Sequence, residues 1–144
     1  MKKIIFLCTG NSCRSQMAEG FAKDMLKDQK CLINSAGVSP NFLNSFAVQV
    51  MSEVGIDIST HYSKNIDTLD LRKFDMVVTV CDNAQKKCQI VRHKKVIHYN
   101  FYDPASSSGT IGQQLNVYRK VRDEIQQMLK ALLTNYDMLC QEIN

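Results

Sequence analysis

Apolar residues in the first part of the chain form a continuous run and then a four-residue spacing. The run Lys2–Cys8 (KKIIFLC) is typical of a short buried strand. From Arg14 to about Leu26, an apolar side chain recurs at every fourth position, as on one face of a helix. These positions are Met17, Phe21 and Met25. The pattern therefore predicts a strand, a tight loop and a helix.

Strands and helices continue to alternate over the rest of the chain. The predicted strands are Cys31–Ser35, which ends at Ala36 and Gly37, the β-branched run Met76–Cys81 (MVVTVC), and the weaker candidate Val96–Tyr99. The predicted helical faces are Phe46, Val50 and Val54, closed by Gly55 as a C-cap, and Val117, Val121, Ile125, Leu129 and Leu132 in a long helix from about Gly112 to Leu133. The tail, Thr134–Asn144, gives no clear prediction.

This alternation predicts right-handed βαβ units around a parallel sheet. We expect an α/β fold over residues 1–144: a single three-layer domain with a four-stranded parallel sheet in flavodoxin-like order 2-1-3-4, flanked by helices. Ligands of such sheets bind beyond the carboxyl ends of the strands, where the strand order reverses. Here that point lies between the strands that end at Cys8 and Cys81.

Composition narrows the class of protein. Hydrophobic residues make up 44% and charged residues 22%, which excludes a disordered chain or a fibrous repeat. No apolar run reaches the roughly 18 residues of a membrane span, and the first residues become polar too soon for a signal peptide. The net charge of +4 lacks the dense basic stripe of a nucleic-acid binder. We expect a soluble, cytoplasmic monomer that binds neither nucleic acid nor membrane.

The chain contains six cysteines, and their redox state decides whether they are structural or reactive. A chain without an export signal is expected to stay among reduced thiols, so a disulfide framework is not expected and some cysteines should be reactive. The three histidines, His61, His93 and His98, lack the spacing of a metal site. We therefore expect no bound metal or other cofactor.

The junction between the first strand and helix carries the strongest chemical signal. A cysteine followed six positions later by an arginine is expected by chance roughly 0.2 times in such a chain, so the spacing alone is weak. Here the pair spans a loop of small residues whose backbone N–H groups can point inward, at a helix N-terminus, and this favours a tetrahedral oxyanion. This Cys8 loop comprises Cys8, Thr9, Gly10, Asn11, Ser12, Cys13 and Arg14. The alternative is a buried cysteine beside a surface arginine.

Within this loop, Arg14 offers a planar fork to two oxygens of the anion. The same positive field should lower the pKa of Cys8 below about 8.5 and make it a thiolate nucleophile. Ser15 either hydrogen-bonds that thiolate or caps the helix. Asn11 is suited to a left-handed backbone conformation.

Several motifs now resemble one family. The loop CTGNSCRSQMAEG, with NSAG (34–37), VGIDIS (54–59), VVTVC (77–81), Cys88 and DPA (103–105), resembles the low-molecular-weight tyrosine phosphatase fold, specifically its thioredoxin-coupled arsenate reductase branch. The resemblance implies that Cys8 attacks arsenate and that Asp103 is the general acid. It also implies that Cys81 attacks Cys8 to release arsenite, that Cys88 captures Cys81, and that thioredoxin reduces the final disulfide.

Geometry supports the first part of this relay. If Cys8 and Cys81 end neighbouring strands, the interstrand spacing of about 4.8 Å lies in the range of a disulfide. If residues 82–88 are helical, the axial gap to Cys88 is roughly 10 Å, so the segment must unwind. Gln89–His93 replaces a stretch that is proline-rich in many family members, so this loop is less constrained.

Two other functions stay open. The first is a low-molecular-weight phosphatase that uses Cys8, Arg14 and Asp103, although Ala105, Ser106 and Ser107 replace the aromatic residues that such enzymes place after the Asp-Pro. The second is a non-catalytic thiol redox sensor or oxyanion-binding module.

One cation site of the branch is not expected here. Some reductases of the branch hold potassium through residues that match Asn11, Glu19 and Ser35, and through an Asp where this chain has Lys64. A lysine would place its ammonium group where the cation sits. We therefore expect Lys64 to pair with Glu19 instead.

Overall fold

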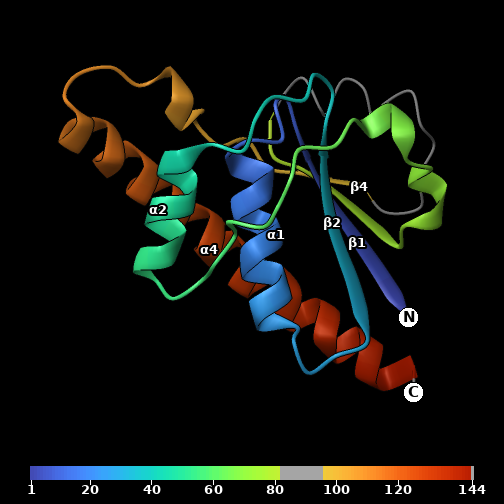
Figure 1. Cartoon of the computed structure of the whole chain (residues 1–144). Helices are drawn as coiled ribbons and strands as arrows, with labels where there is room; N and C mark the ends of the chain where they lie inside the picture. The colour runs from blue at the N-terminus through green and yellow to red at the C-terminus, as the bar shows by residue number, and fades with distance from the viewer. Residues whose placement is uncertain (82–95, 144) are drawn as a thin grey trace.

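Four parallel strands form the centre of the molecule in the computed structural model, which describes residues 1–81 and 96–143, with side chains as far as Thr134. The strands are β1 (Lys2–Cys8), β2 (Cys31–Gly37), β3 (Met76–Thr79) and β4 (Val96–His98). They pair in parallel in the order β2-β1-β3-β4, which confirms the predicted sheet (Figure 1). The strand order reverses at β1, so a ligand site is expected at its carboxyl end.

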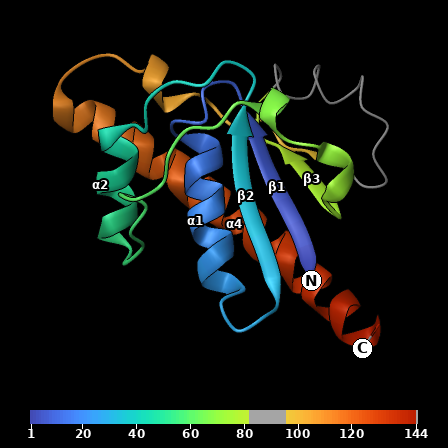
Figure 2. The ribbon, with the colours of Figure 1, turned by 45° about the vertical axis from the view of Figure 1, so that its right-hand side comes forward.

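Three helices pack together beside this sheet. They are α1 (Arg14–Met25), α2 (Ser45–Glu53) and α4 (Ile111–Ile143). α1 lies next to α4 in both views, and α2 contacts them both (Figures 1 and 2). Three short 3-10 turns, η1 (Ile66–Thr68), η2 (Leu71–Lys73) and η3 (Pro104–Ser106), complete the described elements. Among the described residues, no helix combines the length and the hydrophobicity that a membrane span requires.

The continuous apolar run in β1 is explained by its central place. Ile4, Ile5, Phe6 and Leu7 are all fully buried, although successive side chains point to opposite faces of the sheet. Both faces of β1 are therefore covered, as the absence of polar alternation predicted.

The helical faces differ in detail from the predicted ones. α2 buries Ala47, Val50 and Met51, whereas Val54 is 40% exposed, because the helix ends at Glu53 and Val54 is already its C-cap. Gly55 follows with φ +79°, as a helix-ending glycine should.

The long helix also differs from its predicted extent. α4 continues through the tail to Ile143. A strict four-residue spacing drifts around a helix of 3.6 residues per turn, so Val117 and Leu132 are only half-buried. As far as Thr134, the buried apolar face consists of Leu115, Tyr118, Val121, Ile125, Met128, Leu129 and Leu133.

Candidate active site

The Cys8 loop connects β1 to α1 and turns its carbonyl groups outward. Each carbonyl from Cys8 to Cys13 accepts a hydrogen bond. The backbone N–H groups of Val38, Ser39 and Asn41 donate to the carbonyl oxygens of Cys8, Thr9 and Gly10 in that order. Gln16 Nε2 and Ser63 Oγ both donate to the carbonyl oxygen of Asn11. The N–H groups of Asn44 and Met17 donate to the carbonyl oxygens of Ser12 and Cys13. Since the carbonyls are occupied on this side, the amides are left for the opposite side of the loop.

A segment from Val38 to Asn44 supplies most of these donors and lies directly against the loop. Gly37 makes the close approach possible, because a Cβ atom there would lie 2.6 Å from the carbonyl oxygen of Thr9 and 2.9 Å from the amide nitrogen of Asn11. Within the described residues, the N–H groups of Gly10, Ser12 and Cys13 make no hydrogen bond. The loop is therefore a cradle of unpaired donors at a helix N-terminus.

A cavity of about 210 Å³ opens over this cradle. Its lining residues are Cys8, Thr9, Gly10, Ser12, Cys13, Arg14, Ser39, Asn41, Asp103 and Ala105. The structure thus brings together the predicted nucleophile, arginine and acid, which lie up to 95 residues apart in the chain.

Cys8 ends β1 with its thiol buried among hydrogen-bond donors. Its Sγ lies 2.8 Å from Ser15 Oγ and 3.2 Å from the backbone N of Asn11, which donates to it. Asn11 Nδ2 donates to Ser15 Oγ at 2.7 Å, so the Ser15 hydroxyl proton is left to point at the sulfur. Ser15 lies inside α1 and the N-cap position is Cys13, so of its two predicted roles the hydrogen bond to sulfur is the one observed.

Asn11 shapes the loop from its centre. It is fully buried and is the one non-glycine residue with positive φ, +49°, among the described residues, as predicted. Its side chain donates to Ser15 and to Ser35, at 2.7 and 2.9 Å, and its Oδ1 accepts the backbone N–H of Lys64 at 2.9 Å. One side chain therefore holds α1, β2 and the segment after α2 around the loop.

The protonation of Cys8 differs from the prediction. Burial raises the pKa of the Cys8 thiol above its ordinary value, while the Ser15 hydrogen bonds and the Arg14 charge lower it. Burial is the largest of these effects, so the expectation of a lowered pKa was wrong. The loop donors stabilise the thiolate, but the depth at which the sulfur is buried could not be judged from the sequence.

We expect the Ser15→Ala substitution to raise the pKa of Cys8 further, because it removes the hydrogen bond that most favours the thiolate. Below the pKa, the thiolate fraction rises tenfold per pH unit, so alkylation of Cys8 by iodoacetamide should increase with pH. The pH profile of the variant should be displaced to higher pH. Mass spectrometry of the Cys8 peptide measures this rate, and a displacement to lower pH would contradict the assigned role.

Arg14 and Asp103 face each other at the mouth of the cavity. Arg14 is only 8% exposed. Its guanidinium group donates to the carbonyl oxygen of Phe101 at 3.2 Å and lies 3.7 Å from an Asp103 carboxylate oxygen. Asp103 caps the turn η3 by accepting the N–H of Ala105 at 3.1 Å. The Asp-Pro turn is therefore anchored beside the arginine, with the acid partly open to solvent.

The second predicted thiol, Cys81, lies two residues beyond β3, because this strand ends at Thr79 rather than at Cys81 as predicted. β1 pairs with β3 through Leu7 and Thr79, so continuing this register places Cys81 opposite Thr9 rather than opposite Cys8. Accordingly, Cys81 Sγ lies 3.2 Å from Thr9 Oγ1. Cys81 is 3% exposed and is not among the cavity-lining residues, although its charge acts on the pKa of Cys8. Cys81 is therefore close enough to Cys8 to affect its pKa, but it does not line the cavity.

The other cysteines have different surroundings. Cys13 is buried, lies 3.9 Å from the Tyr118 hydroxyl, and has its pKa raised by burial to about 11. Cys31 is half-buried at the start of β2. Cys140 lies in α4 beyond the described side chains, and Cys88, His93 and the segment 89–93 lie outside the described residues.

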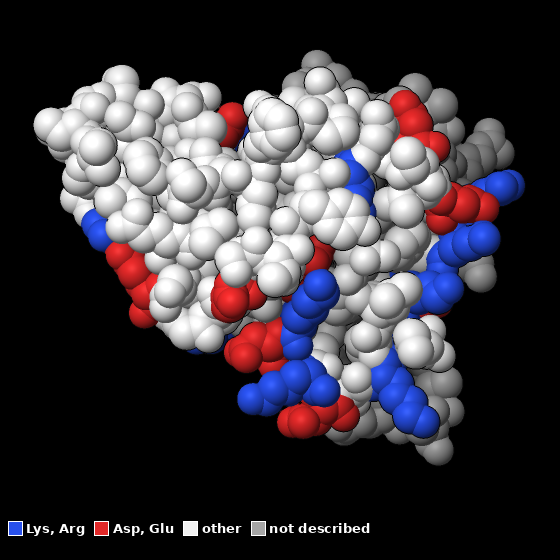
Figure 3. Space-filling view, viewed as in Figure 1, with Lys and Arg blue, Asp and Glu red and all other residues white. Residues whose placement is uncertain are grey.

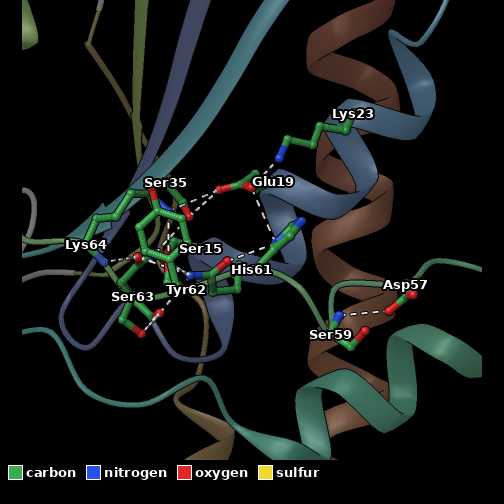
Figure 4. A network of polar contacts seen from close by, with 12 residues as sticks. Ser15, Glu19, Lys23, Ser35, Asp57, Ser59, His61, Tyr62, Ser63 and Lys64 are labelled. Atoms are coloured by element: carbon green, nitrogen blue, oxygen red, sulfur yellow. Dashed lines mark hydrogen bonds and ion pairs between the residues drawn. The ribbon is translucent and has the colours of Figure 1, made fainter.

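A polar network behind the loop was only partly foreseen. The Glu19 carboxylate is buried, accepts Ser35 Oγ at 2.6 Å and Lys23 Nζ at 2.7 Å, and lies 3.4 Å from His61 Nδ1 (Figure 4). His61 carried no motif signal, and Gln16 stood within the loop motif without an assigned role; the fold brings His61 against Gln16 and Glu19. A polar residue at an otherwise buried helix position, such as Gln16, was the available clue.

The predicted pairing of Lys64 with Glu19 is present at 3.9 Å. Burial lowers the pKa of Lys64 and Glu19 raises it, so the carboxylate helps to keep the ammonium group charged. We expect potassium to add no stability beyond that given by sodium, because the ammonium group already stands beside this carboxylate. Thermal unfolding in matched potassium and sodium chloride checks this, and a higher melting temperature in potassium alone would contradict it.

Comparison with known proteins agrees with this geometry. Residues 3–143 match the family model for low molecular weight phosphotyrosine protein phosphatase. The chain is 49% identical over 130 residues to an arsenate reductase of Bacillus subtilis (strain 168), covering 90% of this chain and 93% of the relative. It is 50% identical over 131 residues to an arsenate reductase of Shouchella clausii (strain KSM-K16), covering 90% and 94%.

Solved structures share the whole fold. An arsenate reductase in the phosphate binding state superposes with TM-score 0.78 at 32% identity, covering 94% of this chain and 98% of that one. A low molecular weight protein tyrosine phosphatase from T. tengcongensis superposes with TM-score 0.77 at 29% identity, covering 94% and 99%. The chain therefore belongs to the low molecular weight phosphotyrosine protein phosphatase family.

Proposed function

We propose that this protein is an arsenate reductase that converts arsenate to arsenite through Cys8, Cys81 and Cys88, with thioredoxin as the external reductant. The observation that carries the proposal is the pairing of an oxyanion cradle around Cys8 with a second buried thiol, Cys81, two residues beyond the end of the adjacent strand β3. Hydrolysis of a phosphate ester needs the cradle and the acid Asp103 but no second thiol. Reduction needs a second thiol within reach.

The first step forms a bond between sulfur and arsenic. Arsenate lies in the cradle with its oxygens toward the loop amides and Arg14, and the Cys8 thiolate attacks the arsenic atom. One hydroxide leaves and takes a proton from Asp103, so the products are a Cys8–arsenic(V) adduct and water. Ser15 stabilises the thiolate before this attack, through its 2.8 Å contact.

The second step is the reduction itself. The Cys81 thiolate attacks the Cys8 sulfur, the sulfur–arsenic bond breaks, and its electron pair passes to arsenic. Arsenite leaves, and a disulfide joins Cys8 to Cys81. The Thr9 hydroxyl, 3.2 Å from Cys81, is placed to hold this thiol behind the cradle before attack.

The last steps regenerate the enzyme. Cys88 attacks Cys81, frees Cys8, and leaves a Cys81–Cys88 disulfide for thioredoxin to reduce. The scheme uses no bound metal or prosthetic group. A cytoplasmic location belongs to the same proposal, because the cycle starts from reduced thiols.

A coupled assay tests the function. The protein is mixed with thioredoxin, thioredoxin reductase and NADPH, and we expect NADPH oxidation only when arsenate is added. Hydrolysis of an aryl phosphate ester is measured in parallel, because Cys8, Arg14 and Asp103 would also serve a phosphatase. Rapid hydrolysis without arsenate-dependent oxidation would assign the phosphatase function. Disulfide formation with peroxide, without either reaction, would assign a redox sensor.

A further inference from the structure

Gln16 is a fully buried polar side chain that takes no part in the proposed reaction. It is the third residue of α1 and lies directly behind the Cys8 loop, with an exposed fraction of 0%. Its Nε2 donates to the carbonyl oxygen of Asn11 at 3.0 Å, to Asn11 Oδ1 at 3.1 Å and to the carbonyl oxygen of Tyr62 at 3.0 Å. A single amide group therefore contacts both oxygens of one loop residue.

The surroundings of Gln16 decide which end of its amide faces the loop. The three oxygens around Nε2 can only accept hydrogen bonds, so the nitrogen must lie there and Oε1 must lie at the other end. Oε1 is 3.0 Å from Nδ1 of His61, which therefore donates to it (Figure 4). Nδ1 of His61 also lies 3.4 Å from Glu19. Neutral and protonated imidazole can both carry a proton on Nδ1, so the orientation of Gln16 does not require a charged His61.

The contact with the Asn11 carbonyl directs a backbone donor into the cavity. This carbonyl accepts Gln16 Nε2 and Ser63 Oγ, which both lie outside the loop. In a planar trans peptide, the N–H of the next residue points away from the carbonyl oxygen. The Ser12 N–H therefore points toward the cavity, which Ser12 lines, and it has no hydrogen-bond partner among the described residues. Gln16 thus sets the direction of one oxyanion donor.

The contact with Asn11 Oδ1 orients the side chain that serves the nucleophile. Oδ1 accepts Gln16 Nε2 and the backbone N–H of Lys64, so Nδ2 is turned to donate to Ser15 Oγ at 2.7 Å. The Ser15 proton is then left for Cys8 Sγ, 2.8 Å away. The backbone of Asn11, with φ +49°, has a conformation that a non-glycine residue keeps only with support from its surroundings. Gln16 supplies that support from both sides of the residue.

Surface charge offers little alternative support on this side of the molecule. Residues 31–52 and 104–118, which supply part of the cavity lining, contain no Asp, Glu, Lys or Arg. In Figure 3, charged side chains gather on the lower and right-hand parts of the face, whereas the region over α2 and the segment before α4 is nearly free of them. Apart from its two thiols, the cavity lining carries ionisable side chains only at Arg14 and Asp103. The direction of the loop amides therefore depends on neutral hydrogen bonds.

We propose that Gln16 is the positioning residue of the Cys8 loop. By holding the two oxygens of Asn11, it directs the Ser12 N–H at the bound oxyanion and the Ser15 hydroxyl at Cys8. The inference rests on the oxyanion cradle of the proposed function and holds for whichever oxyanion reacts there.

Gln16→Met tests this role, because methionine has a similar length and no hydrogen-bond donor. Alkylation of Cys8 by iodoacetamide is followed by mass spectrometry, across pH and with increasing inorganic phosphate. We expect half-protection to need about tenfold more phosphate, because the cradle loses a fixed donor. The pH profile should be displaced to higher pH, because Ser15 stabilises the thiolate less. Gln49→Met is the matched control, since Gln49 is an exposed glutamine of α2, and it should change neither measurement.

Further variants separate the two contacts. Ser63→Ala removes the other donor to the Asn11 carbonyl, so it should weaken protection by phosphate without displacing the pH profile. In the Ser15→Ala background, Gln16→Met should still weaken protection but should displace the pH profile little, because its effect on the thiolate passes through Ser15. If Gln16→Met does not fold, Gln16→Asn replaces it with the same expected results, since an amide one methylene shorter cannot keep both contacts with Asn11.

The outcomes separate this role from a merely structural one and from the proposed function. A folded Gln16→Met with unchanged protection and an unchanged pH profile would overturn the positioning role, even if its unfolding temperature were lower. Equal changes in Gln49→Met would overturn it as well. If phosphate does not protect Cys8 in the unchanged protein, the cradle and the positioning role both fail. The expected results without any arsenate reduction would leave the positioning role standing and remove the reductase.

Discussion

Replacing Cys8 with Ser is expected to lower arsenate reduction by roughly 10⁴-fold or more, the scale of effect seen when an enzyme loses its nucleophile. A serine hydroxyl can neither attack arsenic readily at neutral pH nor form the disulfide that carries electrons away from the protein. The substitution changes one atom at a buried position, so the fold and the cradle should persist. The rate is measured as arsenate-dependent NADPH oxidation in the presence of thioredoxin and its reductase.

Cys31→Ser is the matched control for this variant. Cys31 is also a cysteine of the sheet, but it pairs with Lys2 at the start of β2, whereas Cys8 lies at the end of β1. Its loss should leave the rate within about twofold of the unchanged protein. Appreciable turnover by Cys8→Ser, with equal unfolding temperatures for the two variants, would show that another cysteine is the nucleophile.

Replacing Cys88 with Ser is expected to stop the enzyme after one turnover. Cys8 and Cys81 would still release one arsenite per protein molecule, and their disulfide would then persist because nothing captures Cys81. Arsenite is quantified after mixing excess arsenate with the reduced variant, and the disulfide is identified by mass spectrometry of the peptides that contain Cys8 and Cys81. Steady-state turnover with thioredoxin should fall to background.

Cys81→Ser separates the two halves of this relay. That variant should release less than one arsenite per molecule without added thiol, because no neighbouring thiolate attacks the Cys8 adduct. Sustained thioredoxin-dependent turnover in Cys88→Ser would refute the second exchange. A full equivalent of arsenite from Cys81→Ser would refute the first.

Features that depend on local pattern were predictable from the sequence. The unbroken apolar run of β1 indicated a strand covered on both faces, and this placed it at the centre of the sheet. The strand, small-residue loop and helix identified the Cys8 loop, and Asn11 adopts the left-handed conformation that its short polar side chain tolerates. Each conclusion needed only residues within about twenty positions of one another.

Features that depend on register or burial depth were not predictable. A run of apolar residues does not state which of them pair, so the sequence did not show that Cys81 meets Thr9 rather than Cys8. The pKa of Cys8 depends on how completely neighbouring elements bury its sulfur, a property of the assembled fold. The contacts of Gln16 with His61 and Asn11 are likewise set by tertiary structure.

Backbone hydrogen bonds join the Cys8 loop to residues 38–44, and they constrain the side chains of that segment very little. Main-chain atoms hold the loop there, so the bonds from Ser39 and Asn41 survive almost any change of side chain. Gly37 is an exception, since the two backbones touch at that point. Substitutions along this segment can therefore remodel the entrance while the reacting groups stay in place. One frame of backbone hydrogen bonds can thus hold the same nucleophile beside entrances of different shape.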